Sequence, residues 1–326
     1  CNEKMPEFRQ VTFLTAYFIG ENNEIVYCEE LQSVANYLMK NEYNVYLLDI
    51  LRDTNKVAYL NKNSIVKRKL NENKILHVGF FGKPITSKKL MLSLCDYVEE
   101  FFKFLEKFNR IDGVRIINSY KTLKYNLSKQ YILDYQDKFK FYETVRVHNF
   151  ADILKYNRDK KKYLVKPLVS ERGIGSKVLD GVNEEELKDY YNRYKLSGLI
   201  VQPYSNDFIK YGERKICFIK GECVLSRKVV QKGDEELVCH HSGSKKEFYK
   251  PSKQELELGK KVYEEFSKKY DLSYYRLDVT SDRKNPIINE VEALNPDFCS
   301  VIYGKKDLEK YHKSVKEMLE NVRKNE

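Results

Sequence analysis

The segment 163–179, which reads YLVKPLVSERGIGSKVL, restricts the possible folds of this chain more than any other stretch. It begins with strand-forming residues, reaches Lys166 and a proline, and then enters a loop with Gly173 and Gly175 before apolar residues return at Val178. Glycine lets a backbone approach a ligand without a Cβ atom in the way. The segment predicts either a β-hairpin whose loop amides cover phosphate groups or a plain hairpin in which the glycines serve only the turn.

Two other phosphate-binding loops do not fit this segment. A Walker A loop requires the spacing GxxxxGK[ST], which GIGSK lacks. A dinucleotide-binding fingerprint requires a third glycine at the position of Val178. Lys166 lies at the end of the first strand, where it can neutralise phosphate oxygens as a compact charge. The alternative for Lys166 is an exposed lysine at a strand end.

Acidic residues near the end of the chain indicate a cation site. Asp278 stands in a mostly apolar strand, and Glu290 and Glu292 are two residues apart, so both glutamates project from one face of their strand. Like charges on one sheet face are costly unless a cation lies between them. Together with Asn295 just beyond, these oxygen donors suit Mg²⁺. The alternative is an edge strand whose glutamates face solvent.

The hydrophobic pattern divides the chain into two regions. Strands and helices alternate over residues 10–117, which predicts a small parallel α/β layer, and the pattern changes from residue 121. Helices are expected at 30–41, 87–108, 127–139, 150–157, 184–196, 256–270 and 307–322. Strands are expected at 10–18, 43–50, 112–118, 141–147, 163–165, 198–204, 212–219, 222–230, 272–280 and 286–294. The helix caps are expected at Asn149, Asn183 and Ser252, and a hairpin turn at Lys220-Gly221.

Charge and cysteine content narrow the classes of protein. Lys and Arg number 59 against 48 Asp and Glu, which gives a net charge of +11, but basic and acidic residues are mixed, as in NEEELKDYYNRYK. This favours a basic surface that attracts a polyanionic substrate over nucleic-acid binding, because no basic patch with interleaved aromatic residues supports the latter. Seven cysteines without a CxxC pair indicate reduced thiols, a cytoplasmic protein and no zinc site.

Neither a membrane span nor a signal peptide is expected from the sequence. No apolar run approaches the ~20 residues that a membrane helix needs. The first ten residues, CNEKMPEFRQ, are charged and lack the apolar segment of a signal peptide. The length of 326 residues suits two or three subdomains.

Several segments, taken in order, resemble the ATP-grasp superfamily in its glutathione-synthetase-like branch. These segments are NLSKQYILD, YLVKPLVSERGIGS, LIVQPYSNDFIKYGERKICFIKGECVLSRKVV, YYRLDV and INEVEALNP. The Glu-x-Glu pair and the Gln-Pro dipeptide are similar to those of the cycloserine-biosynthesis ligases. The resemblance implies an ATP-grasp fold of the α/β class, α+β in parts, with a Rossmann-like α/β domain at 1–120. Two α+β subdomains would clamp ATP, a small lid at 121–201 and a C-terminal subdomain with the metal site at 202–326.

The resemblance also implies roles for individual residues. It assigns ATP contacts to Lys129, Lys166, Ser170, Gly173, Gly175, Ser176, Val201, Gln202 and Asp207, of which Val201 and Gln202 lie at the adenine and Asp207 at the ribose. It places three residues over the γ-phosphate and the acyl substrate, as catalytic groups: Arg214, Lys215 and Arg227. It assigns Mg²⁺ to Asp278, Glu290, Glu292 and Asn295.

The implied activity is an ATP-dependent carboxylate–amine ligase that works through an acyl phosphate on small amino acids or peptides. One alternative is an intramolecular cyclo-ligase of a modified amino acid, and another is a catalytically silent ATP-grasp-like protein with a binding or structural role. The stretch CHHSGSKK departs from the family pattern, which has a glycine pair there. His240 and His241 within it either bind substrate or transfer protons, or have no role. A homodimer is expected from the family alone.

Overall fold

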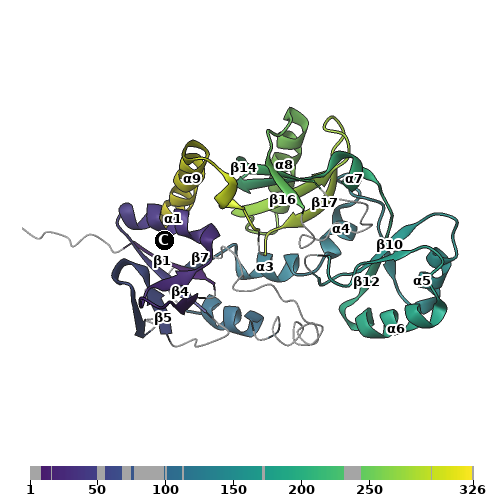
Figure 1. The fold of residues 1–326 in the computed structure, drawn as a ribbon, viewed down its shortest axis with the longest axis horizontal. Helices are drawn as coiled ribbons and strands as arrows, with labels where there is room; N and C mark the ends of the chain where they lie inside the picture. The colour runs from purple at the N-terminus through teal and green to yellow at the C-terminus, as the bar shows by residue number, and fades with distance from the viewer. Residues whose placement is uncertain are drawn as a thin grey trace, which may run out of the picture.

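The computed structural model describes residues 9–15, 17–49, 56–67, 75–76, 99, 101–111, 114–170, 173–230, 244–294 and 296–324. Three sheets form the frame of the molecule: an N-terminal sheet, a central sheet near the C-terminal end of the sequence, and a lid sheet. Figure 1 shows them side by side along the long axis, with the N-terminal sheet on the left and the lid sheet on the right.

The N-terminal sheet has the strand order β6-β5-β4-β1-β7-β8. Its strands are β1 (Arg9–Leu14), β4 (Tyr43–Leu48), β5 (Lys56–Tyr59), β6 (Ser64–Lys67), β7 (Ile75–Leu76) and β8 (Ile116–Ile117). The pairs β4-β1, β1-β7 and β7-β8 are parallel, which confirms the predicted α/β layer. The antiparallel additions β5 and β6 were not predicted, because their short segments carry no clear period.

Helix α1 (Glu29–Lys40) packs on this sheet through Leu31, Val34, Ala35 and Leu38, the apolar stripe seen in the sequence. Residues 101–109 are helical, and Phe101, Leu105 and Phe108 join the core with β1 and β4. Residues 87–98 of the helix expected at 87–108 lie outside the described residues. A two-stranded ribbon, β2 (Tyr17–Ile19) with β3 (Ile25–Tyr27), and a short 3-10 turn, η1 (Leu60–Lys62), complete this region.

The lid sheet is antiparallel, in the order β11-β10-β12-β9. Its strands are β9 (Val145–Val147), β10 (Tyr163–Pro167), β11 (Lys177–Leu179) and β12 (Leu199–Pro203), with α5 (Phe150–Asn157), α6 (Glu184–Tyr194) and η2 (Lys195–Ser197) against it. Asn149 forms a capping box with Asp152, and Asn183 accepts two amide hydrogen bonds at the start of α6, as predicted. The hairpin β10–β11 is the one expected from segment 163–179.

The central sheet is antiparallel, in the order β15-β14-β13-β16-β17. Its strands are β13 (Glu213–Ile219), β14 (Glu222–Val230), β15 (Lys245–Phe248), β16 (Tyr274–Thr280) and β17 (Ile287–Glu292). Both residues of the predicted turn have positive φ, 49° at Lys220 and 80° at Gly221, as a two-residue hairpin turn requires. Helix α8 (Lys253–Phe266) begins at the predicted capping box of Ser252 and Glu255 and packs against one face through Phe266.

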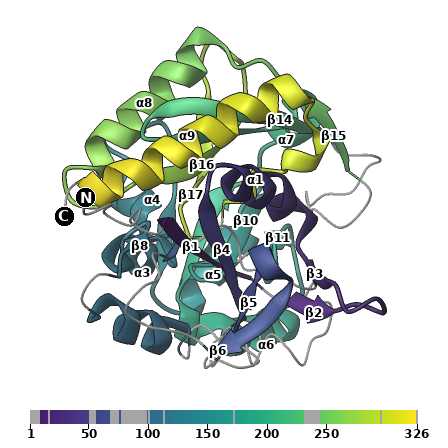
Figure 2. The ribbon, with the colours of Figure 1, turned by 90° about the vertical axis from the view of Figure 1, so that its left-hand side faces the viewer.

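Further helices join the sheets. They are α3 (Tyr120–Asn126), α4 (Gln130–Tyr135), α7 (Asp207–Tyr211), η3 (Ser300–Ile302) and α9 (Lys305–Lys324). One apolar core includes Val11 of β1, Cys217 of β13 and Tyr311 of α9, so α9 bridges the N-terminal and central sheets; Figure 2 shows α9 crossing above α1. Among the helices that the structure describes, none has the length and apolar character required to cross a bilayer.

The division at 1–120, 121–201 and 202–326 stays a prediction. Tyr131 and Ile132 of α4 share a core with the central sheet and α8. Strand β12 continues from Val201 to Pro203 within the lid sheet. Packing therefore connects the three regions rather than leaving them joined by open linkers.

Candidate active site

A row of charged side chains crosses the central sheet. Arg227, Lys215, Asp278 and Glu290 are successive partners on β14, β13, β16 and β17. Partners directly opposite each other lie on the same face of a sheet. The four side chains therefore share one face. The other face carries apolar residues that pack with α8, for example Ile216 and Leu277.

Asp278 is the most buried member of the row, with no exposed surface. Its carboxylate accepts hydrogen bonds from Lys215 Nζ at 2.6 Å, Arg276 Nε at 2.6 Å and Arg276 Nη2 at 2.9 Å. Burial alone would raise the pKa of Asp278, but Arg276 and Lys215 outweigh burial and hold this pKa well below its ordinary value. Asp278 is thus ionised and anchors two cations.

An irregularity in the pairing of β16 with β17 widens the polar face. Asp278 pairs with Glu290 and Val279 pairs with Ile288, so Asn289 has no partner in the register. Such bulges redirect side chains next to functional sites. Here Asn289 Nδ2 donates to Glu213 Oε1 at 2.7 Å. Glu213 in turn lies 2.9 Å from Lys215 Nζ.

Lys129 connects the central sheet to the glycine loop. Its Nζ lies 3.0 Å from Glu290 Oε1 and donates to the carbonyl oxygen of Ser170 at 2.7 Å. Its backbone amide donates to the Leu168 carbonyl at 2.9 Å, so the start of α4 is attached to the end of β10. The pKa of Glu290 is lowered: burial and the nearby Asp278 raise it, but Lys129 and Arg276 together outweigh them. A single ammonium group therefore joins the loop and the acidic strand.

Lys166 is a second lysine at this junction. It is buried in β10, 7% exposed, and among the described residues its side-chain ammonium has neither a hydrogen-bond partner nor an ion-pair partner. Burial, with a contribution from the nearby Lys129, lowers the pKa of Lys166 to about 8, against the opposing influence of Glu290 and Glu213. A buried lysine without a partner is costly, and a bound anion would relieve that cost.

The glycine loop has the conformation that its sequence requires. Gly173 and Gly175 have φ values of 73° and 77°, in the region that favours glycine. A Cβ atom on Gly175 would lie 2.8 Å from Pro167 Cγ. The Tyr190 hydroxyl donates to the Gly175 carbonyl at 2.7 Å, and the Ser176 amide to the Gly173 carbonyl at 3.0 Å. Residues 171–172 of the loop lie outside the described residues.

The residues predicted at adenine and ribose lie on and after β12. Strand β10 pairs with β12 as far as Pro203, whereas β9 pairs only with Leu199 to Val201. The backbone from Gln202 onward therefore extends past β9. The Gln202 side chain is buried and donates to Thr144 Oγ1 at 2.7 Å. Asp207, at the start of α7, accepts a hydrogen bond from Tyr142.

Arg214 lies apart from the other predicted catalytic residues. It follows Glu213 and precedes Lys215, so it projects from the opposite face of β13. Its guanidinium donates to Glu255 Oε1 at 2.7 Å and to two backbone carbonyls. The geometry does not support a direct catalytic role for Arg214. Lys215 and Arg227, by contrast, belong to the charged row.

Sequence reasoning missed several residues of the site. Arg276, two residues before Asp278, shares its face, and this spacing was a usable signal. Asp297 binds Arg227 Nη2 through its carboxylate at 3.0 Å and accepts from Arg227 Nη1 through its carbonyl at 3.0 Å, and no sequence pattern indicated this contact. The Asn126 side chain of α3 holds the end of β17: its Nδ2 donates to the Val291 carbonyl and its Oδ1 accepts from the amides of Ala293 and Leu294. Three predicted residues lie outside the described residues: Asn295, His240 and His241.

The residues present suit a nucleotide with Mg²⁺. Glu290 and Glu292 offer carboxylate oxygens on one face, which are ligands that Mg²⁺ prefers. Glu290 is partly exposed, with 24% of its side-chain surface accessible, whereas Asp278 is enclosed by its two cations. Lys166, whose ammonium has no partner among the described residues, lies near Glu290 at the end of the strand that enters the glycine loop. Anionic phosphates and a divalent ion complement this mixture of charges.

Comparisons with known proteins find likeness in structure and none in sequence. No model of a known protein family matches the chain, and no curated protein matches it. The crystal structure of the D-cycloserine synthetase DcsG matches with a TM-score of 0.70 and 13% identity, over 95% of this chain and 99% of that chain. The macrocyclase MdnC from Microcystis aeruginosa MRC, bound with a precursor peptide, matches with a TM-score of 0.62 and 12% identity, over 96% and 99%.

A further match is D-alanyl-alanine synthetase A from Vibrio cholerae O1 biovar eltor str. N16961. Its TM-score is 0.57 at 12% identity, over 97% of this chain and 99% of that chain. A solved ATP-grasp ligase, PsnB, is complexed with its minimal precursor, Mg and ADP. Because the sequence identities are only 12–13%, the structural likeness establishes the fold alone. The chain has the ATP-grasp fold, as the sequence resemblance implied.

Proposed function

We propose that this protein is an ATP-dependent ligase that joins a carboxylate to an amine. The observation that carries the proposal is the position of Lys129, which touches both the glycine loop at Ser170 and the acidic strand at Glu290. A loop that covers phosphates and a strand that offers metal ligands are useful together only where a nucleotide lies between them. The ATP-grasp fold supports the same assignment.

The chain's own residues would neutralise the negative charge of the nucleotide and hold the positive charge of the metal ion. Lys129, Lys166 and the loop amides would bind the phosphates, and Glu290 and Glu292, with Asn295, would hold Mg²⁺. When bound, Mg²⁺ offsets charge on the oxygens of the transferring phosphoryl group. Asp278 fixes Lys215 and Arg276 in place, so that these cations need no rearrangement as negative charge develops.

The reaction would proceed in two steps. A substrate carboxylate attacks the γ-phosphorus of ATP, which releases ADP and forms an acyl phosphate. The lone pair of an amine then attacks the acyl carbon, the amine loses a proton, and inorganic phosphate leaves. Negative charge gathers on oxygen in both steps, and Lys215 and Arg227 lie on the face where it would form. Neither step requires a nucleophilic side chain.

Ring closure within one substrate is the second candidate. It is favoured by the structural match to a D-cycloserine synthetase at a TM-score of 0.70 and by the match to a macrocyclase. The two reactions differ in the number of substrates. An intramolecular ligase releases ADP with one compound, whereas an intermolecular ligase requires a pair.

The test is ADP and phosphate release with Mg²⁺ and amino acids or short peptides, offered singly and in pairs. ATP with Mg²⁺ should also raise the melting temperature, because a ligand that binds only the folded state stabilises it. Glu290→Gln should lower ADP release by about 100-fold or more, and Glu222→Gln, which changes an exposed carboxylate on β14 of the same sheet, should not. Absence of stabilisation by ATP would contradict the nucleotide site. ATP binding without turnover on any pair would favour the silent alternative.

A further inference from the structure

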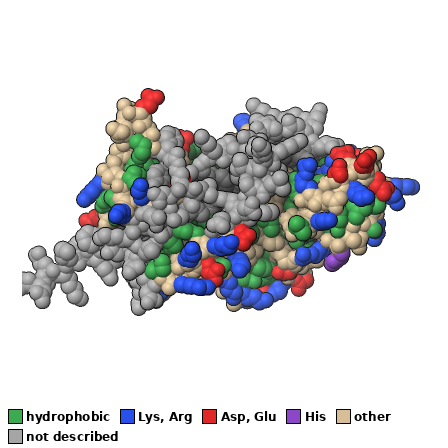
Figure 3. All heavy atoms as spheres, turned by 90° about the horizontal axis from the view of Figure 1, so that it is seen from below, with side chains coloured by type: hydrophobic (Ala, Val, Ile, Leu, Met, Phe, Trp, Pro, Cys, Tyr) green, Lys and Arg blue, Asp and Glu red, His purple; other side chains and the backbone are tan. Residues whose placement is uncertain are grey.

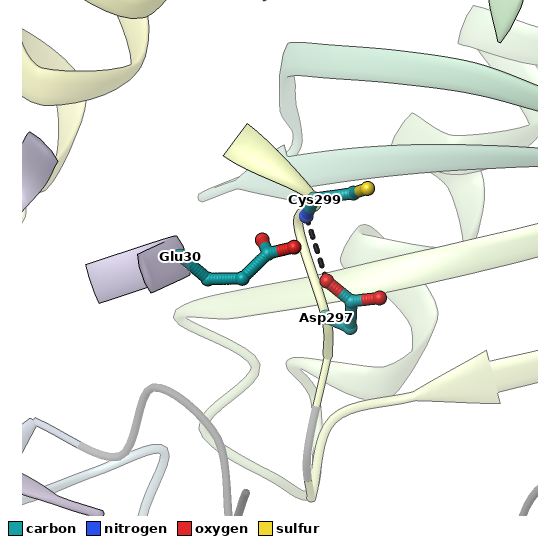
Figure 4. A group of neighbouring side chains, drawn as sticks. All are labelled: Glu30, Asp297 and Cys299. Carbon is teal, nitrogen blue, oxygen red and sulfur yellow. Dashed lines mark hydrogen bonds between the residues drawn. The ribbon is translucent and has the colours of Figure 1, made fainter. Parts of the chain in front are cut away.

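Three side chains outside the charged row meet between the N-terminal and central sheets. They are Glu30 of α1, Asp297 and Cys299, and one ligand atom from each lies within 4.8 Å of the others. Figure 4 shows Glu30 reaching from α1 toward the loop that contains Asp297 and Cys299. This loop directly follows the acidic strand β17. The cluster is therefore a contact between the N-terminal layer and the end of the proposed metal strand.

The two carboxyl groups of the cluster have different hydrogen-bond donors. Asp297 Oδ1 accepts from the Cys299 amide at 2.7 Å, and Asp297 Oδ2 from Arg227 at 3.0 Å. Glu30 Oε2 accepts from the Ser300 amide at 2.8 Å. Asp297 thus has a guanidinium partner, whereas the Glu30 carboxyl group has one neutral donor among the described residues and faces a carboxylate. Two ionised carboxylates in this position would repel each other, and a proton on Glu30 converts the repulsion into a hydrogen bond.

The charges around Glu30 favour the same assignment. Burial and the facing Asp297 raise the pKa of Glu30 to about 7, although Arg227 opposes the shift. Burial alone would raise the pKa of Asp297, but Arg227 and Arg276 outweigh it and lower this pKa. The dipole at the start of α1 favours an ionised Glu30 by less than about one pKa unit, which is too little to reverse the order.

The other titratable groups near Glu30 come from several elements. They are Cys28 at the start of α1, Tyr311 of α9, Arg227 of β14, and Asp297 and Cys299 of the loop. Burial raises the pKa of Cys28, Cys299 and Tyr311, so these three stay neutral at neutral pH. Lys246 lies beyond, with its Nζ 3.4 Å from Cys299 Sγ. The positive charge near the pair is already supplied by arginine and lysine, so a metal ion is not required.

We propose that Glu30 is a positioning residue that, in its protonated form, holds Asp297 and through it Arg227 and Arg276 for the ligase reaction. The proposal rests on the proposed function for its catalytic consequence. Asp297 contacts both arginines, Arg227 at 3.0 Å and Arg276 through its carbonyl at 3.4 Å. Arg276 in turn holds Asp278. Loss of the proton on Glu30 would push Asp297 away and loosen this chain of contacts.

The first test measures the melting temperature without any substrate, from pH 5.5 to pH 8.5. The pKa of Glu30 is raised in the folded state, so its stabilising contribution is complete below its ordinary value and is lost as pH rises through about 7. The wild-type protein should therefore melt at lower temperature as pH rises from 5.5 to about 7, and this contribution should level off at higher pH, where the carboxyl group is ionised in both the folded and the unfolded states. Glu30→Gln, which keeps the neutral form, should melt with a shallower decline, and Glu29→Gln, an exposed neighbour on α1, should behave as wild type. Equal slopes in wild type and Glu30→Gln would overturn the proposal.

The second test compares kcat/KM for ADP release at pH 6 and pH 8. At pH 8, one unit above the pKa of Glu30, about a tenth of the molecules retain the proton, so the wild-type rate should fall about tenfold. Glu30→Gln should match wild type at pH 6 and keep its rate at pH 8, whereas Glu30→Ala should be slow at both. Equal pH profiles in the wild type and Glu30→Gln would remove the positioning role.

The proposal can be tested without the ligase activity and without a folded Glu30→Gln variant. The melting experiment needs no turnover, so it remains informative if the proposed ligase activity fails. If Glu30→Gln does not fold, infrared difference spectra of the wild-type protein between pH 6 and pH 8 should show the loss of a protonated carboxylic acid. A spectrum without such a band would overturn the proposal.

Discussion

Asp278 and Glu290 face each other across β16 and β17, and we expect their neutralisation to have opposite consequences. Asp278→Asn removes a fully buried anion that holds Lys215 and Arg276. Breaking a buried ion pair by removing one partner typically costs about 3–5 kcal/mol. Lys215 retains Glu213 at 2.9 Å, so we expect the lower end of that range, about 3 kcal/mol. By the scaling for domains of 150–250 residues, this corresponds to a melting temperature lower by about 6–12 °C.

Glu290→Gln should affect activity rather than stability. The Glu290 side chain is 24% exposed and has one cationic partner, Lys129. Partly exposed ion pairs contribute about 0–1 kcal/mol, so the melting temperature should change by no more than about 4 °C. ADP release should nevertheless fall by about 100-fold or more, since groups that act on transition-state charge typically contribute this much.

The assay is thermal unfolding of both variants beside ADP release at saturating ATP and Mg²⁺. Glu222→Gln, on the same sheet and exposed, controls for the loss of a carboxylate. Equal destabilisation by Asp278→Asn and Glu290→Gln would contradict the assignment of a structural role to Asp278 and a catalytic role to Glu290, because it would mean that Glu290 contributes as much to stability as Asp278. An unchanged melting temperature for Asp278→Asn would refute the buried ion network.

Three other substitutions probe the site. Lys166→Met should stabilise the ligand-free protein by on the order of 1–3 kcal/mol at pH 7, because the pKa of Lys166 is lowered to about 8 and protonation of the buried side chain at pH 7 opposes folding. The same variant should show a smaller ATP-induced rise in melting temperature. A destabilised variant would contradict this expectation. Gly175→Ala should lower the free energy of unfolding, measured with denaturant, more than Gly181→Ala does, since both glycines have positive φ but only a Cβ atom on Gly175 would meet Pro167. Equal losses would show that the contact with Pro167 has no effect on stability. Asn126→Ala should cost about 1–3 kcal/mol and speed hydrogen exchange at the amide of Ala293, which Asn126 binds at 2.6 Å; unchanged exchange would show that Asn126 does not fix β17.

The basic composition bears on the nucleic-acid alternative. On the face shown in Figure 3, Lys and Arg side chains are interspersed with acidic and apolar ones over the described residues. This agrees with the mixed charge seen along the sequence. Binding of nucleic acid would support that alternative if the logarithm of the binding constant fell with the logarithm of the salt concentration, with a slope that corresponds to several phosphate contacts.

Local signals in the sequence were sufficient for many elements. The caps at Asn149 and Ser252 and the turn at Lys220-Gly221 depend on contacts within a few residues, the hairpin around Gly173 joins adjacent segments of the chain, and the structure contains each of them. The two-residue period of a strand likewise placed Glu290 and Glu292 on one face. The same period separates Arg214 from Lys215, although the resemblance alone grouped them.

Most of the long strands and helices, the glycine loop and the acidic strand β17 could be predicted from residue patterns, because their signals are short in range, whereas short strands such as β5 and β6 could not. The contacts between the charged side chains became visible in the folded chain alone: Lys129 with Glu290, Asp278 with Arg276 and Lys215, and Glu30 with Asp297. The Glu30–Asp297 contact joins residues more than 250 positions apart. It depends on how α9 and α1 pack between two sheets, and the hydrophobic periodicity of the sequence predicts local structure but not this packing. Ion pairing in the site follows from that packing, since burial decides which charges must find a partner.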